Sequence, residues 1–212
     1  MNQKALEAID NLYEVFGEFP KPLNIEGCPC CVDEKDTFTL LSKPLRSLTD
    51  QELSSYASSL FLTVGDEADF RYFLPRIFEI SANEVGWWPD PEIVLGKLRR
   101  AGWNSWTPKE REAILKFIDA VLDDCMKDSQ SDIDTWVCAI AHCVDDMIPY
   151  LEKIKQNTES LIRLYEENSQ ALIKGKLSNA FWEDARDKGV QVIEWFNSPE
   201  IIKIINEYYK KK

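Results

Sequence analysis

The sequence predicts an all-α protein, an irregular multi-helix bundle or α-α array of about eight to ten helices with no substantial sheet. Apolar residues recur every three to four positions along most of the chain, which is the period of a helix buried on one face. Strict alternation of apolar and polar residues, the pattern of a half-buried strand, is almost absent. Helix-start signals also recur, and the strongest is Thr107-Pro108-Lys109-Glu110, an N-cap followed by a first-turn proline and a capping-box glutamate.

In the first part of the chain, this pattern predicts five helices, over residues 3–16, 49–64, 66–78, 91–98 and 107–126, with Gly65 as the stop after the second. The second begins at a Thr49 and Glu52 capping box. Pro75 predicts a kink or a restart in the third, because proline lacks the N–H that a helix interior uses. The long proline-rich segment 18–48 is predicted to be a loop, within which Thr37–Leu41 forms a short strand or an apolar plug.

The remaining chain predicts four helices, over residues 131–154, 159–174, 179–196 and 199–209. Pro149 predicts a kink in the first of them. The polar break at 127–131 is short, and no repeat of fixed period is visible. We therefore expect a single all-α domain over residues 1–212, with lobes at 1–128 and 129–212 as the alternative.

Composition narrows the class of protein. The chain has 212 residues, is 44% hydrophobic and carries a formal net charge of -12, so it has enough apolar material for a core and is not disordered as a whole. Its longest apolar runs, such as Trp136–Ala141, are far shorter than the ~20 residues of a membrane span, and Met1–Glu7 lacks the apolar run of a signal peptide. A sequence pI near 4.7 disfavours binding to nucleic acid or anionic membranes. We expect a cytoplasmic protein.

Three motifs occur in a fixed order in residues 28–122: a Cys-Pro-Cys-Cys loop, the run Asp69-Phe70-Arg71-Tyr72-Phe73-Leu74-Pro75-Arg76-Ile77-Phe78-Glu79, and Ala101-Gly102-Trp103-Asn104-Ser105-Trp106-Thr107. Together they resemble a family of all-helical bacterial proteins with no assigned activity. The resemblance implies a bacterial, cytoplasmic protein. It implies no known activity, and it does not extend to the C-terminal third of the chain.

Cysteine spacing suggests a thiol or zinc site. Closely spaced thiolates in a loop can form half of a zinc site, and two residues four apart on a helix can form the other half. The candidate ligands are Cys28, Cys30, Cys31, Cys138 and His142. A redox pair of Cys28 and Cys31 and ordinary packed thiols are the alternatives. We expect no cofactor, with zinc as the alternative, and we expect Cys125 and Cys143 to be core residues.

Other catalytic sites are disfavoured by what the sequence lacks. His142 is the only histidine, so multi-histidine metal sites and histidine relays are disfavoured. No glycine-rich phosphate loop, nucleophile elbow or dinucleotide fingerprint occurs. Asp119 and Asp123 share one helix face and could bind magnesium, against the simpler interpretation of a solvated acidic face.

A concentration of acidic residues is the strongest functional signal. Residues 119–146 contain eight aspartates and one basic residue, Lys127, a net charge of -7: Asp119, Asp123, Asp124, Asp128, Asp132, Asp134, Asp145 and Asp146. Such a field speeds association with basic partners, although a generally acidic surface is the alternative. Two turns add candidate aromatic anchors, Trp87, Trp88, Trp103 and Trp106, unless these pack in the core.

We therefore expect an acidic protein-interaction module that binds a basic protein partner. An immunity protein that neutralises a cationic nuclease-type toxin is one concrete version. The alternatives are a zinc- or thiol-dependent protein that uses the Cys28–Cys31 loop and a magnesium-dependent enzyme with a carboxylate site.

Overall fold

The computed structural model describes residues 1–28 and 33–211, and within these ranges the predicted all-α fold is confirmed. The described chain is 70% helical, has no strands and contains eleven α-helices, slightly more than the eight to ten predicted. No helix in this described part is both long and apolar enough to cross a membrane. The chain divides into two compact units, unit 1 (Met1–Val121) and unit 2 (Leu122–Lys212). Cys30 and Cys31 lie outside the described residues.

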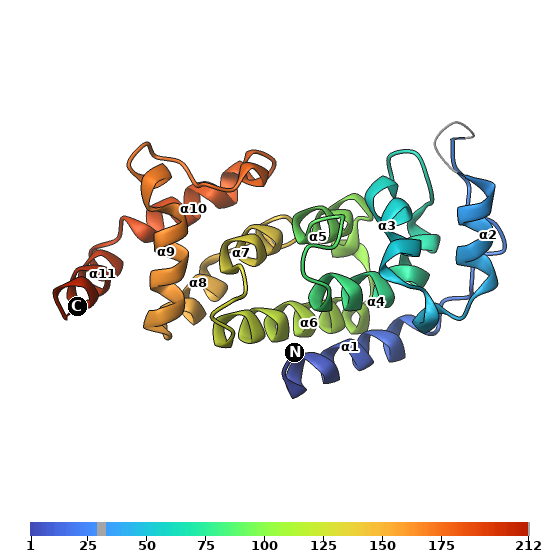
Figure 1. Cartoon of the computed structure of the whole chain (residues 1–212), viewed down its shortest axis with the longest axis horizontal. Helices are drawn as coiled ribbons and strands as arrows, with labels where there is room; N and C mark the ends of the chain where they lie inside the picture. The colour runs from blue at the N-terminus through green and yellow to red at the C-terminus, as the bar shows by residue number, and fades with distance from the viewer. Residues whose placement is uncertain (29–32, 212) are drawn as a thin grey trace. The chain divides into compact units, whose positions relative to one another are not determined.

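Unit 1 contains the first five α-helices, two 3-10 helices and most of the sixth α-helix (Figure 1). Their bounds are α1 (Gln3–Phe16), α2 (Glu34–Ser42), η1 (Leu45–Ser47), α3 (Asp50–Ser59), α4 (Glu67–Asn83), α5 (Pro91–Arg100), η2 (Trp103–Ser105) and α6 (Pro108–Lys127). Helix α4 packs against α1, α3 and α5. Its buried aromatic stripe, which includes Phe70, Phe73 and Phe78, therefore forms the centre of this unit's core.

Side-chain caps set the helix starts in unit 1. The Thr49 hydroxyl accepts from the Glu52 N–H while the Glu52 carboxylate accepts from the Thr49 N–H, as predicted. Thr107 and Glu110 form the same reciprocal pair at the start of α6. These caps satisfy N–H groups that have no partner within the helix, so each start is encoded locally.

Three predictions for unit 1 differ from the structure. Thr37–Leu41 is helical, in α2, and the segment is neither a strand nor a bare loop. Asp33 caps α2 by accepting from the Lys35 N–H at 2.8 Å, and the Thr39 hydroxyl donates to the Lys35 carbonyl at 2.9 Å, so local hydrogen bonds outweigh the strand propensity of threonine. The helix predicted to extend up to Gly65 ends at Ser59, as α3, and α4 runs through Pro75 without a restart.

Unit 2 contains the end of α6, five further α-helices and one 3-10 helix: α7 (Ile133–Ala141), α8 (Ile148–Lys155), α9 (Thr158–Leu172), η3 (Ala180–Glu183), α10 (Arg186–Phe196) and α11 (Pro199–Lys211). Helix α9 packs against α7 and α8, and α10 packs against α8 and α11. The helix predicted over 131–154 is two helices, because the chain leaves α7 at His142 and starts again with Pro149 in the first turn of α8.

Candidate functional site

The loop that follows α3 is held in an unusual backbone conformation. The Lys97 ammonium is 4% exposed and donates to the Ser58 and Leu60 carbonyls, at 2.8 Å each. Burial, with a smaller contribution from Arg100, lowers the pKa of Lys97 to about 8. Phe61, which follows Leu60 in the chain, has a φ of +62°, a left-handed conformation that costs a non-glycine residue about 1–2 kcal/mol. The Lys97 bonds fix the carbonyls just before this strained residue.

A distant segment pairs with the same loop. The Cys28 N–H donates to the Thr63 carbonyl and the Gly65 N–H donates to the Glu26 carbonyl, both at 2.8 Å. These bonds form an isolated antiparallel bridge at Val64. The bridge places Gly27, in the connection between α1 and α2, beside Val64, in the connection between α3 and α4.

A cavity of about 850 Å³ opens where these two segments meet. We call it the acidic cavity, and its lining residues are Glu26, Gly27, Cys28, Phe61, Leu62, Thr63, Val64, Gly65, Asp66, Glu67 and Arg100. Among these described lining residues, three carry carboxylates and one carries a cationic group. Leu62 is 62% exposed and adds apolar surface at the same place. The cavity volume lies in the range of small-molecule or side-chain binding sites.

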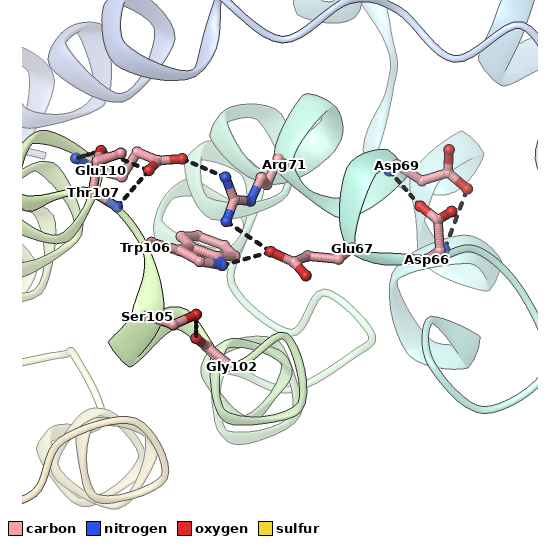
Figure 2. Close-up of polar contacts among 9 residues, drawn as sticks. All are labelled: Asp66, Glu67, Asp69, Arg71, Gly102, Ser105, Trp106, Thr107 and Glu110. Carbon is pink, nitrogen blue, oxygen red and sulfur yellow. Dashed lines mark hydrogen bonds and ion pairs between the residues drawn. The ribbon is translucent and has the colours of Figure 1, made fainter.

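Asp66 and Asp69 form the capping box that begins α4 beside this cavity (Figure 2). The Asp69 N–H donates to Asp66 Oδ1 at 3.0 Å, and the Asp66 N–H donates to Asp69 Oδ2 at 3.3 Å. Burial, and then the neighbouring Asp66 carboxylate, raises the pKa of Asp69 to about 6. The cap therefore places the Asp69 carboxyl group next to Asp66. Near neutral pH this group adds to the negative potential around Asp66.

A polar network holds Glu67 in place (Figure 2). Glu67 Oε1 accepts from Trp106 Nε1 at 2.8 Å and from Arg71 Nη2 at 2.7 Å, while Arg71 Nη1 donates to Glu110 Oε1 at 2.9 Å. The guanidinium of Arg71 also lies 4.3 Å from the centre of the Trp106 ring and 5.1 Å from that of Phe19. Glu110 is 4% exposed, so the network ties the rim of the acidic cavity to the core of unit 1.

Arg71 of α4 forms an ion pair with Glu110 of α6, and this pair links the two helices. The network joins two of the three motifs of the resemblance, through Arg71 and Trp106. Cys28 and Glu67 line one cavity, and Trp106 contacts Arg71 from the long aromatic run. The arrangement fixes carboxylate groups around a partly apolar space, which is chemistry suited to binding a cation.

Three of the four predicted tryptophan anchors are buried in unit 1. Trp87, Trp103 and Trp106 are 8%, 5% and 3% exposed, and the Trp87 indole N–H donates to the Asp50 carbonyl at 2.9 Å. Burial takes these three side chains off the accessible surface, so they cannot act as surface anchors. Trp88 is 53% exposed, and the anchor role stays a prediction for this residue alone.

Several of the eight predicted aspartates have structural partners. Asp119, in unit 1, pairs with Lys4 at 2.6 Å, and Asp123, in unit 2, pairs with Lys153 at 2.6 Å. These lysines occupy the two carboxylates that the magnesium alternative requires. Asp134 is 6% exposed and accepts from the Asn168 side chain at 2.7 Å, so it too is held inside the protein.

The other aspartates lie on α6 and on the two connections that flank α7. Asp124 is half-buried on α6, and Asp128 and Asp132 are exposed before α7, where each accepts from a nearby backbone N–H. Asp145 and Asp146 are exposed beyond the other end of α7. Helix α7 has nine residues, a length of about 13 Å at 1.5 Å per residue. The two acidic loops therefore lie at opposite ends of α7, and the acidic face stays a prediction.

The candidate zinc ligands are divided between the units. Cys28 belongs to unit 1, while Cys138 and His142 belong to unit 2, where Cys138 is fully buried and His142 Nε2 lies 3.1 Å from the Phe181 carbonyl. Within residues 1–28 and 33–211, no three His, Cys, Asp or Glu side chains are placed to hold a metal ion. Because Cys30 and Cys31 lie outside these ranges, the zinc site stays a prediction. Cys125 and Cys143 are buried, as expected.

No sequence pattern indicated a role for Glu26, and Gly65 was predicted only as a helix stop. The residues before Gly65 read as a helical stripe, and no local pattern indicates that they pair with the segment around Gly27. A glycine directly before an Asp-x-x-Asp helix start was the one available signal of a turn at this position.

Comparisons with known proteins identify no relative of this chain. No family model, curated protein or solved structure matches the chain. The resemblance to a bacterial family therefore stays a prediction based on its three motifs, and the functional argument depends on the residues of the site.

Proposed function

We propose that the chain is a protein-interaction module that binds a basic protein partner, and that the acidic cavity of unit 1 receives a cationic side chain of that partner. The observation that carries this proposal is the lining of the cavity. Glu26, Asp66 and Glu67 contribute three carboxylates, of which Glu67 is paired with Arg71, and Arg100 is the cationic residue among the described lining residues. A cationic side chain entering between them gains electrostatic energy that a neutral or acidic one does not.

The surroundings of the cavity support the same proposal. Glu67 is already held by Trp106 and Arg71, so little side-chain freedom is lost when a partner binds. Phe61 and Leu62 offer apolar surface to the methylene groups of a lysine or arginine stem. Unit 1 contains 20 acidic and 13 basic residues, a net charge of -7, which favours encounter with a basic protein.

A cationic nuclease-type toxin is one partner with this chemistry, and the chain would then be its immunity protein. The support for this narrower proposal is charge complementarity alone. Any basic protein with an exposed lysine or arginine meets the same requirement.

Binding of a ten-lysine peptide tests the proposal. We expect the affinity of the full chain for this peptide to fall steeply between about 50 and 300 mM salt, since the attraction is screened. Glu26→Lys, which reverses one exposed charge of the lining, should weaken binding about tenfold at low salt.

Two substitutions with the same charge change serve as comparisons. Glu84→Lys, at an exposed position of unit 1 outside the cavity, should change the affinity less than about threefold. Asp145→Lys makes the same change in the acidic stretch of unit 2. If Asp145→Lys or Glu84→Lys weakened binding as much as Glu26→Lys, the cavity would not be the binding site.

A further inference from the structure

Unit 2 contains a cavity of about 560 Å³, which we call the α10 cavity. Its walls are residues 175–179, which lie between α9 and η3, together with η3 and one face of α10. On α10 the lining residues follow the helical spacing i, i+3, i+4, i+7: Arg186, Gly189, Val190 and Ile193. The volume lies in the range of small-molecule binding sites.

Much of the α10 cavity is lined by apolar side chains. Leu177, Trp182 and Ile193 come from its three different walls, and Trp182 is 6% exposed. Val190 adds an aliphatic side chain that is 52% exposed. An apolar group in contact with these side chains would remove their surface from water, which is favourable.

Gly189 keeps part of this apolar space open. A Cβ atom at this position would lie 3.5 Å from Trp182 Cε3 and 3.8 Å from Leu177 Cδ1, which are ordinary van der Waals distances. Neither a steric clash nor a left-handed backbone therefore requires glycine here, although glycine within a helix is less favourable than alanine. The missing side chain leaves space beside Trp182 and Leu177, which favours a bound apolar group.

Hydrogen bonds to buried groups hold the wall formed by residues 175–179. The Ser178 N–H donates to Asn168 Oδ1 at 2.8 Å, and the Ser178 hydroxyl donates to the Glu167 carbonyl at 2.7 Å. Asn168 is fully buried, and its Nδ2 donates to Asp134 Oδ1 at 2.7 Å. The wall is thus tied to α9 and α7 before anything binds, so a ligand loses little free energy in ordering it.

The charge of the lining is opposite in sign to that of the whole chain. Lys176 and Arg186 contribute two cationic side chains and Glu183 one carboxylate, in a chain with a net charge of -12. Both cationic residues are exposed, and within residues 1–28 and 33–211 neither forms an ion pair. Arg186 Nε donates to the Glu183 backbone carbonyl at 3.1 Å, which orients the guanidinium. Its terminal N–H groups and the Lys176 ammonium can therefore donate to an anion.

We propose that the α10 cavity binds a small aliphatic monocarboxylate, of the kind of a medium-chain fatty acid. The carboxylate pairs with Lys176 and Arg186, and the aliphatic chain contacts Trp182 and occupies the space beside Gly189. A neutral molecule with the same chain gains only the apolar part of this interaction. The inference goes beyond the proposed function, because it concerns a small molecule and uses no residue that lines the acidic cavity.

The test titrates octanoate, 1-octanol and acetate separately into the full chain at neutral pH and measures the heat of binding. We expect octanoate to bind at least about fivefold more tightly than 1-octanol, which has the same chain length and no charge. Acetate, which keeps the carboxylate and lacks the chain, should not bind detectably at the same concentrations. Equal affinity for octanoate and 1-octanol, or no binding of octanoate, would overturn the proposal.

Gly189→Ala tests where the aliphatic chain lies. The added methyl group occupies space that the octanoate chain would use, so octanoate should bind at least about threefold more weakly. The ligand-free variant should be as stable as the wild type or more stable in chemical denaturation, because alanine favours the helix and meets only ordinary contacts. Unchanged octanoate binding in this variant would place the chain elsewhere and contradict the proposal.

Substitutions of the cationic residues test where the carboxylate lies. Lys176→Gln and Arg186→Gln should each weaken octanoate binding at least about threefold and leave 1-octanol binding unchanged, since only octanoate carries a charge. Lys203→Gln, an exposed position on α11 outside the cavity, makes the same charge change and should alter octanoate binding less than about 1.5-fold. Wild-type octanoate binding in both cavity variants, or an equal loss in Lys203→Gln, would show that the proposed carboxylate site is wrong.

Discussion

Asp69 illustrates how burial changes the behaviour of a single carboxyl group. Its pKa is raised from 3.8 to about 6, first by burial and then by the Asp66 carboxylate. The folded state therefore binds more protons than the unfolded state between these two values. Stability contributed by the protonated group is present below about pH 4 and is lost as the pH rises toward 6.

Asp69→Asn is expected to remove this pH dependence, because an amide does not titrate. The free energy of unfolding of the variant, minus that of the wild type, should increase by about 1 kcal/mol as the pH rises from 4 to 7. This magnitude allows for partial solvent screening. Urea unfolding at several pH values measures the effect. Parallel pH profiles for the two proteins would contradict it.

A matched control lies in unit 2. Glu167 has a pKa raised to about 7, by burial first and then by Asp132 and Asp134. In Glu167→Gln, the free energy of unfolding should therefore fall less with rising pH than in the wild type, up to about pH 7. For Asp69→Asn the same difference should end near pH 6.

Single residues also show where the sequence is informative and where it is not. The Thr107 and Glu110 cap was predicted because both partners lie within one helical turn. The burial of Trp106 was not, because it depends on Phe16, Phe70 and Arg71, which are distant in the sequence. An aromatic residue in a turn has the same local pattern whether it faces solvent or a core.

At the scale of elements, the connection from α3 to α4 forms one wall of the acidic cavity. Lys97 fixes its beginning, the bridge to Gly27 fixes its middle, and the Asp66 cap fixes its end. Gly65 is required there for two reasons, its φ of +67° and the contacts that a Cβ atom would make with Leu60 and Tyr56.

Gly65→Ala separates these two reasons when it is compared with Gly102→Ala. Gly102 has a φ of +64°, but no heavy atom lies within 4 Å of its Cβ position, so alanine there should cost only the backbone term of about 1 kcal/mol. Gly65→Ala should cost about 2–3 kcal/mol, because steric contact is added. Chemical denaturation measures both, and equal losses would show that the close approach at Gly65 is absent.

Elements were predicted well where their signals are local. Nine helices follow from apolar periodicity and caps, and two more arise where a predicted element was wrong: α2 replaces a strand or plug, and α7 and α8 replace one kinked helix. In α2, Asp33 and the threonine hydroxyls satisfy backbone groups locally, so β-branched residues do not prevent a helix.

At the scale of the whole molecule, negative charge is distributed over both units. Unit 1 has a net charge of -7, and unit 2, with 17 acidic and 12 basic residues, has -5. The run of aspartates that dominates the sequence includes ion-paired, buried and helix-capping residues. Charge density along the chain thus overstated the acidic surface, because the sequence does not show which carboxylates have partners.

The candidate site could not be predicted, for a related reason. The acidic cavity forms where a segment near Gly27 pairs with the loop at Val64, and each of these segments alone reads as an ordinary connection. The excess of carboxylates is what led to the expectation of a basic partner, and that expectation stays a prediction.

The most direct test of the account is to map the ten-lysine peptide onto the isotope-labelled full chain by NMR. The account predicts that the largest amide shift changes occur at Gly27, Thr63 and Gly65, which line the acidic cavity. Changes concentrated instead at Asp145 and Asp146, or spread evenly over exposed carboxylates of both units, would contradict it.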